Sequence, residues 1–147
     1  MGHTISNVKT HQSAGIFGNI ATGGIIKNAA FVEIFADIAS STSDGRLLAD
    51  VLEGTLENVY VQGRFNETGL GIVKMQGESS RIRNCVFNVE QGTVASTSAI
   101  IRQQDKLGTI ESSVYAISSE LPKFEQNTTN TANRLYTDVA KMLAENE

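Results

Sequence analysis

Apolar and polar residues alternate along several short stretches of this 147-residue chain, and one such stretch recurs five times. In each copy an aliphatic residue lies two positions before an asparagine, and further apolar residues mostly follow one and three positions after it. The fifth copy has serine in place of the asparagine. The copies are TISNVKT at 4–10, IIKNAAFV at 25–32, TLENVYVQG at 55–63, RIRNCVFNV at 81–89 and TIESSVYAI at 109–117. Because residues two apart face the same side of a β-strand, each copy predicts a strand.

The marker residues of the five copies recur at intervals of 21 to 30 residues, a repeat length typical of stacked, solenoid-like architectures. Stacking would place the aliphatic residues in one continuous core column, made of Ile5, Ile26, Leu56, Ile82 and Ile110. Asparagine tolerates a left-handed backbone, so each marker is predicted at a bend, with the side-chain amides bonded to one another as a ladder. This role is structural, and no ligand is assigned to the markers Asn7, Asn28, Asn58, Asn84 and Ser112.

A second apolar run follows each of the first four copies, at 15–20, 45–52, 69–75 and 98–103. Glycine-rich turn signals then precede the next copy, at 23–24, 54, 77–80 and 108. Each repeat is therefore predicted as strand, loop, strand and turn. The polar loops at 40–45, 65–69 and 90–97 vary most, and we expect any recognition surface there. The stretch 29–39 also fits a helical face, but the repeat favours a continued strand.

The pattern ends after Ile117, and Pro122 begins a different segment. Residues 122–130 are predicted to be a linker. Residues 131–147 keep apolar positions at helical spacing and are predicted to form an amphipathic helix, which covers the last repeat or docks on a neighbour. The sequence thus predicts an all-β domain over 1–121, a right-handed parallel β-helix (solenoid) of about four to five coils, followed by a linker and a C-terminal α-helix.

Two segments also have a family resemblance. GIFGNIATGGIIKNAAF at 15–31 and GTLENVYVQGRF at 54–65 resemble the GLUG-type repeats of bacterial surface proteins. More broadly, the arrangement resembles the right-handed parallel β-helix of phage tailspikes and polysaccharide lyases. The resemblance covers residues 4–117 and implies a fold used for display, adhesion or virion architecture. It brings no catalytic motif with it, because a fold does not fix a function.

Charge and composition narrow the expected partners. The net charge is −4 without a basic stripe, which argues against nucleic-acid binding. No run approaches the ~18 apolar residues of a membrane helix, so no membrane partner is expected. The single cysteine, Cys85, excludes an intrachain disulfide and is predicted to be a small buried residue. His3 and His11 are the only histidines and lack a nearby acid or thiolate, so no metal site is predicted.

Candidate catalytic residues are few. Asp37, Asp44 and Asp50 form the one close set of carboxylates, and Lys74 and Arg83 are the candidate bases of a lyase. A glycosidase needs two carboxyl groups on one groove, roughly 5–10 Å apart, and no recognisable constellation accompanies these residues. We expect solvated charges here. The sequence therefore predicts no catalytic residue, no cofactor and no metal, and a protein that is not an enzyme.

The leading hypothesis is a non-enzymatic structural or interaction protein of a phage virion, either a capsid decoration or a fibre-type β-helix at the virion surface. Because the chain starts within a repeat, its partners are expected to be other copies or neighbouring subunits at the first coil and at the C-terminal helix. One alternative is a fragment of a bacterial cell-surface adhesin with GLUG-like repeats. Another is a polysaccharide-binding or polysaccharide-cleaving β-helix whose loops hold surface glycans.

Overall fold

The computed structural model describes residues 2–11, 15–37, 46–65, 71–90, 101–103, 108–117 and 134–136. Within these ranges the regular elements are β-strands, and no helix occurs. The strands are β1 (His3–Ser6), β2 (Lys9–His11), β3 (Phe17–Ile20), β4 (Ile25–Asp37), β5 (Ala49–Leu52), β6 (Thr55–Phe65), β7 (Val73–Met75), β8 (Arg81–Arg83), β9 (Val86–Glu90), β10 (Ile101–Gln103), β11 (Thr109–Glu111), β12 (Val114–Ile117) and β13 (Arg134–Tyr136).

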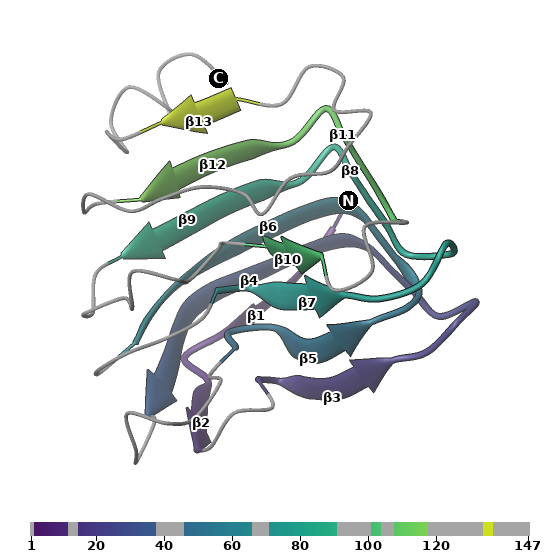
Figure 1. Ribbon diagram of the computed structural model, residues 1–147. Coiled ribbons are helices and arrows are strands. Elements are labelled where there is room, and N and C mark those ends of the chain that lie inside the picture. The colour runs from purple at the N-terminus through teal and green to yellow at the C-terminus, as the bar shows by residue number, and fades with distance from the viewer. Residues whose placement is uncertain are drawn as a thin grey trace.

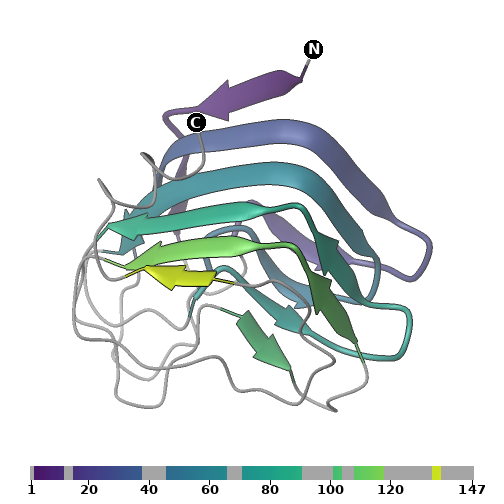
Figure 2. The ribbon, with the colours of Figure 1, turned by 90° about the horizontal axis from the view of Figure 1, so that it is seen from above.

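The strands form two parallel sheets (Figure 1). The larger sheet has nine strands in the order β1-β4-β6-β9-β12-β13, with β2 paired to β4 and β8 paired to β6 and β11. The smaller sheet has four strands in the order β10-β7-β5-β3. The chain alternates between them, so that β5 follows β4, β7 follows β6 and β10 follows β9. Figure 2 shows β1 at one edge of the larger sheet, with β4, β6 and β9 following in turn.

The predicted aliphatic column holds over four of its five members. Ile26 lies opposite Leu56, Leu56 opposite Ile82, and Ile82 opposite Ile110. The side chains of Leu56, Ile82 and Ile110 are buried, and Ile26 packs partly buried against the same cluster. Burying a side chain of this size contributes about 1.5–3 kcal/mol, so the column is a main source of stability.

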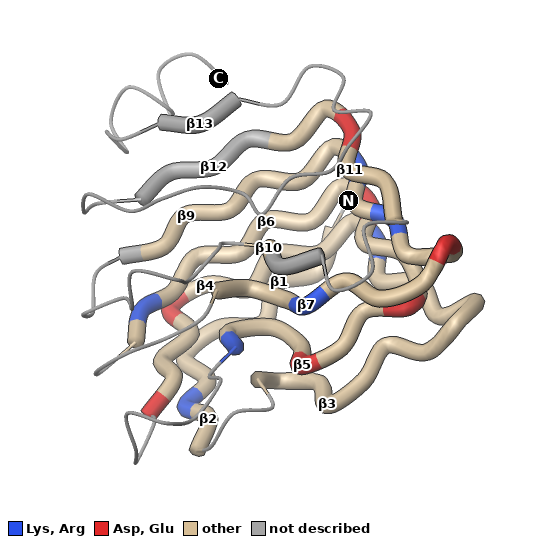
Figure 3. Tube along the Cα trace, in the orientation of Figure 1, with Lys and Arg blue, Asp and Glu red and all other residues tan. Residues whose placement is uncertain are grey.

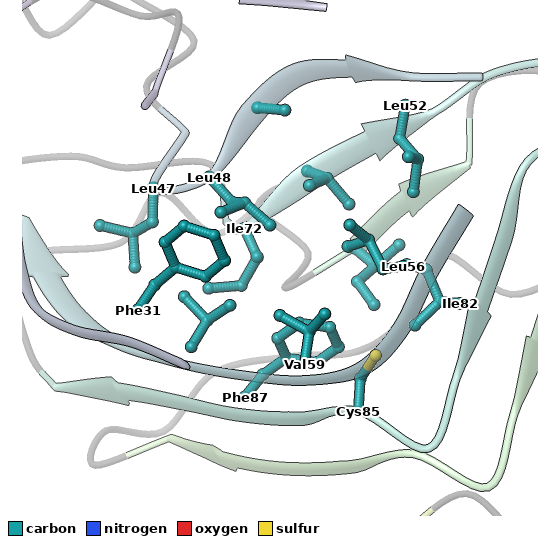
Figure 4. Packing of buried hydrophobic residues seen from close by; sticks show 14 of the residues in the cluster. Phe31, Leu47, Leu48, Leu52, Leu56, Val59, Ile72, Ile82, Cys85 and Phe87 are labelled. Carbon is teal, nitrogen blue, oxygen red and sulfur yellow. The ribbon is translucent and has the colours of Figure 1, made fainter. Parts of the chain in front are cut away.

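The core lies between the two sheets. Phe31, Val59 and Phe87 approach it from the larger sheet, as Figure 4 shows. Leu48, at the start of the smaller sheet, and Ile72, just before β7, meet them from the opposite side. The second apolar runs predicted from the sequence therefore form the strands of the smaller sheet, and they supply the facing half of the core.

The predicted bends are confirmed at all five markers, including Asn7, whose φ is 58°. Asn28, Asn58 and Asn84 have φ of 53°, 53° and 51°, and Ser112 has φ of 46°. The Nδ2 of Asn58 donates a hydrogen bond of 2.9 Å to Oδ1 of Asn28, which is one rung of the expected amide ladder. These residues turn the chain of the larger sheet, and their side chains are exposed. The bends and this hydrogen bond agree with the structural role that the sequence predicted.

Asn7 belongs to a different bend, and its predicted alignment with Asn28 is wrong. Strand β1 pairs with the middle of β4, residues 29–32, so that Ile5 lies opposite Phe31, and Asn7 then aligns with Glu33. Both residues have positive φ, 58° for Asn7 and 56° for Glu33. The sequence misled because β4 bends twice, and its second bend has glutamate where asparagine or glycine is the usual choice.

The turns that lead into the larger sheet are stacked through backbone hydrogen bonds. Thr55 N–H donates to Gly24 O at 2.9 Å, and Arg81 N–H donates to Gly54 O, also at 2.9 Å. Gly54 lies so close to the preceding turn that a Cβ atom there would meet the carbonyl oxygens of Gly24 and Ala21. The glycine is needed at this position because backbone passes directly against backbone.

The predicted fold class is wrong in two respects. Residues 131–147 were expected to form an amphipathic helix, but residues 134–136 form strand β13, which pairs in parallel with β12. The described residues also do not make the regular, closed right-handed β-helix of four to five coils. They form two sheets of unequal size that are partly open. Strand pairing explains the first error, because residues 134–136 gain backbone hydrogen bonds along the free edge of β12, and helical spacing of apolar residues does not reveal that edge.

The stretch 29–39 continues as a strand to Asp37, as the repeat predicted. The loop at 40–45, nearly all of the loops at 65–69 and 90–97, and the linker at 122–130 lie outside the described residues.

Candidate functional site

The first strands of the two sheets, β1 and β3, lie at the same end of the stack, which we call the open end. Among the described strands, β1 pairs with β4 alone and β3 with β5 alone. Ile5 is in register with Phe31 and therefore faces the core side of the sheet. Phe31 is 1% exposed, whereas Ile5 is 42% exposed. The interior of the protein is thus incompletely covered at the open end.

Strands β1 and β3 have no Lys, Arg, Asp, Glu or Pro, whereas β2, which follows β1 and also pairs with β4 alone among the described strands, has Lys9 and His11. Strand β1 reads HTIS and β3 reads FGNI, and Figure 3 shows β3 free of lysine, arginine, aspartate and glutamate. Sheet edges in soluble proteins are usually protected by such residues, by bulges or by a covering segment. The free edges of β1 and β3 lie at one end of the protein, and Ile5 is exposed there. Together they are suited to pairing with another chain.

A groove of about 640 Å³ lies next to the open end, on the outer face of the larger sheet. It follows the second bend, where Asn7 and Glu33 adopt left-handed backbone. Strands β2, β4 and β6 contribute most of its walls. The lining residues are Asn7, Val8, Lys9, Glu33, Ile34, Phe35, Gln62, Gly63 and Arg64.

One row of the groove places an aromatic ring between two cations. Lys9 lies opposite Phe35, and Phe35 lies opposite Arg64 on the next strand. The Nζ of Lys9 is 5.5 Å from the centroid of the Phe35 ring, and the Cζ of Arg64 is 5.1 Å from it. Each such cation–π contact contributes about 0.5–1 kcal/mol at an exposed position. Arg64 forms no ion pair with another described side chain.

A carboxylate, that of Asp37, lies next to Lys9, and Asp37 is opposite His11 two residues further along the strands. The Nζ of Lys9 is 2.8 Å from Oδ2 of Asp37, and Nδ1 of His11 is 3.5 Å from the same oxygen. The hydrogen bond from Lys9 holds the pKa of Asp37 below its ordinary value, with smaller contributions from the charges of Lys9 and His11. The carboxylate is therefore favoured in its ionised form and partly neutralises Lys9.

The neighbouring row of the groove is polar. Glu33 is exposed, and its backbone N–H donates a 2.8 Å hydrogen bond to Oε1 of Gln62. A non-glycine residue in left-handed backbone costs on the order of 1 kcal/mol, and this hydrogen bond offsets part of that cost. The groove therefore presents a carboxylate and amides beside the cation–aromatic row.

The remaining catalytic candidates are not assembled into a site. Asp37 ends β4 in the larger sheet, Asp50 lies on β5 in the smaller sheet, and Asp44 is outside the described residues. Arg83 forms a 2.8 Å ion pair with Glu57, and this hydrogen bond raises the pKa of Arg83 further. A guanidinium held in its charged form is a poor base. Lys74 lies on β7, in the smaller sheet.

The residues considered for metal binding and thiol chemistry lie on strands or in the core. His3 lies on β1 and His11 on β2, and the described residues contain no group of three His, Cys, Asp or Glu side chains able to hold a metal ion. Cys85 is buried, and burial raises the pKa of its thiol to about 11. Its backbone N–H donates to Oγ of Ser113 at 3.3 Å. The prediction of a small buried residue at Cys85 is confirmed.

The cation–aromatic row was not predicted, although the sequence contains a signal for it. Aligning the bend at Asn7 with the one at Glu33 places Val8 beside Ile34 and Lys9 beside Phe35. That alignment was passed over because two asparagines were matched by residue type. Ile5 was predicted to be a core residue. Its exposure depends on what covers it, which the alternation of apolar and polar residues does not reveal.

Comparisons with protein-family models, with curated proteins and with solved structures found no match to this chain. Among the described residues there is also no helix long and apolar enough to cross a membrane. The case for a function therefore depends on the open end and on the groove beside it.

Proposed function

We propose that this chain is a non-enzymatic structural protein of a phage virion and that it assembles with neighbouring subunits through its open end. The observation that supports this proposal is Ile5, which faces the core side of the sheet yet is 42% exposed on a strand without charge. A subunit placed there removes apolar surface from water and pairs the free edge of the strand. A decoration or fibre protein has to assemble with its neighbours through contacts of this kind.

The adhesin alternative uses the same open end in a different setting. A stalk on a bacterial surface would cover β1 with the preceding segment of the stalk, not with a virion subunit. The genes beside the coding sequence separate the two: capsid and portal genes support the virion, and a secretion signal with a wall anchor supports the adhesin.

A substitution at the open end tests the proposed function. Ile5→Glu is expected to reduce incorporation of the chain into virions by about tenfold or more, because it places a charge where apolar contact is needed. The measurement is the copy number per particle by quantitative mass spectrometry, after circular dichroism has shown that the variant folds.

Arg81→Glu is the matched control, since it changes an exposed residue on β8, away from the open end. Its copy number should equal that of the wild type. Absence of the wild-type chain from virions, or a cryo-EM map of the particle with Ile5 facing solvent, would contradict the proposed function.

A second candidate function is the binding of an acidic polysaccharide in the groove. The observation that favours it is Phe35 between Lys9 and Arg64, with the amides of Asn7 and Gln62 nearby. Cations bind the carboxylates of such a glycan, and amides hydrogen-bond its hydroxyl groups.

An array of acidic and neutral glycans tests the groove. Acidic glycans should bind the wild-type chain, and Arg64→Ala should weaken that binding about tenfold through loss of one charged contact. Arg83→Ala removes an exposed cation outside the groove, and its binding should match the wild type. Equal binding by the Arg64 and Arg83 variants, or no preference for acidic over neutral glycans, would reject this candidate.

A further inference from the structure

We infer that the occupant of the open end is a second copy of this chain, related by a two-fold axis and paired with β1 in an antiparallel register. This inference rests on the proposed function, because it names the partner for the same open end. This pairing joins the larger sheet of one copy to the larger sheet of the other, so that one continuous sheet crosses the axis.

The register follows from which way the side chains of β1 point. Ile5 shares the core side with Phe31, and Thr4 and Ser6 therefore face outward. Residues directly opposite each other in an antiparallel pair lie on the same face of the sheet. Any two-fold axis that passes at a residue of β1 keeps a shared core face, and an axis at Ile5 is the one that also brings the two exposed isoleucines together. It places Ile5 opposite Ile5 of the second copy and Thr4 opposite Ser6 of the second copy.

The segment Thr4-Ile5-Ser6 is self-complementary in this register. The two isoleucines shield each other on the core side, and each threonine meets a serine hydroxyl on the outer side. Cross-strand pairs of these kinds contribute about 0.2–1 kcal/mol each. No like charges oppose one another, since β1 has no Lys, Arg, Asp or Glu.

A two-fold contact also covers the open ends of both copies at once. One isologous interface covers the open end of each copy, and the assembly then closes. Strand β3 lies at the same end and likewise has no Lys, Arg, Asp or Glu, so this strand places no like charges against a second copy (Figure 3).

Disulfide trapping tests the antiparallel register. Opposite residues in an antiparallel pair have Cα atoms about 4.5–5.5 Å apart, within the range of a disulfide. Two copies of residue 4 would lie about 8 Å apart in this register, which is beyond that range. A mixture of Thr4→Cys and Ser6→Cys chains is therefore expected to give mainly the mixed 4–6 dimer on mild oxidation, well above the one-half share that random collision produces.

The controls use residues that the structure keeps apart from the interface. Cys85 is buried with a raised pKa, so the wild-type chain should form no disulfide dimer. Arg81→Cys, on β8, should cross-link only slowly. In sedimentation equilibrium the wild type should dimerise, Ile5→Glu should weaken the dimer about a hundredfold, and Arg81→Glu should leave it unchanged.

Three results would overturn the two-fold pairing: a wild-type chain that stays monomeric, a random share of mixed 4–6 dimers, or Arg81→Cys cross-linking as fast as the β1 variants. A monomeric chain whose open end is covered by another protein in the virion would reject the pairing and leave the proposed function standing. A chain that dimerises as described but is absent from virions would reject the proposed function and leave the pairing standing.

Discussion

Replacing Ile82 with aspartate is expected to prevent this chain from folding. Ile82 is fully buried on β8, and its register partners on the two neighbouring strands, Leu56 and Ile110, are aliphatic and cannot pair with a carboxylate. A buried, unpaired charge costs more than about 4 kcal/mol, a large share of the 5–15 kcal/mol that typically holds a domain together. Circular dichroism and urea denaturation should show a chain without the cooperative transition of the wild type, and Leu56→Asp should behave alike.

Ile25→Asp is the control for this result. Ile25 also lies in the larger sheet, but its side chain is 62% exposed, so the same chemical change should alter the free energy of unfolding by less than about 1 kcal/mol. If the Ile82→Asp chain unfolds with the same urea midpoint as the wild type, the strand register is wrong.

Gly54→Ala is expected to destabilise the protein by about 2–4 kcal/mol, an unusually large effect for one added methyl group. The new Cβ would meet the carbonyl oxygens of Gly24 and Ala21 in the preceding turn. Gly24 O already accepts the N–H of Thr55, so the turn cannot move aside without losing a hydrogen bond. Urea denaturation monitored by circular dichroism measures the difference.

Gly18→Ala separates this packing effect from the general cost of replacing glycine. Gly18 lies on β3, where an added Cβ would have no atom within 4 Å. The substitution should leave stability unchanged or raise it by about 0.5 kcal/mol, since alanine restricts the unfolded chain. Equal losses for the two variants would contradict the close approach of the turns.

The features that the sequence predicted correctly depend on neighbours along the chain. Alternation around Leu56 and Ile82 identifies strands and their buried side, because both follow from residues two apart. The bends at Asn28, Asn58 and Asn84 follow from the chemistry of asparagine itself. Such local signals were enough to find most strands of the larger sheet and all four strands of the smaller one.

The features that the sequence did not predict depend on which strand lies beside which. Leu135 fits a helical face, but pairing with β12 places it in a strand. Asn7 and Asn28 have the same chemistry at different bends, so matching them by type shifted the register of β1. The meeting of Lys9 with Phe35 follows from the observed register, whereas the exposure of Ile5 follows from the position of β1 at the edge of the described sheet.

The direction of the strands also determines how the protein responds to force. Its covalent backbone runs across the stack, whereas the hydrogen bonds between strands point along it, as in the parallel pairing of β4 with β6. Tension along the stack therefore loads hydrogen bonds and side-chain contacts before it loads the covalent connections between rows, and it peels one strand row after another from an end. Compression along the same axis is resisted by the interlocked core. A part built in this way is suited to being pressed between neighbours, and it resists being pulled away from them only as strongly as its outermost row.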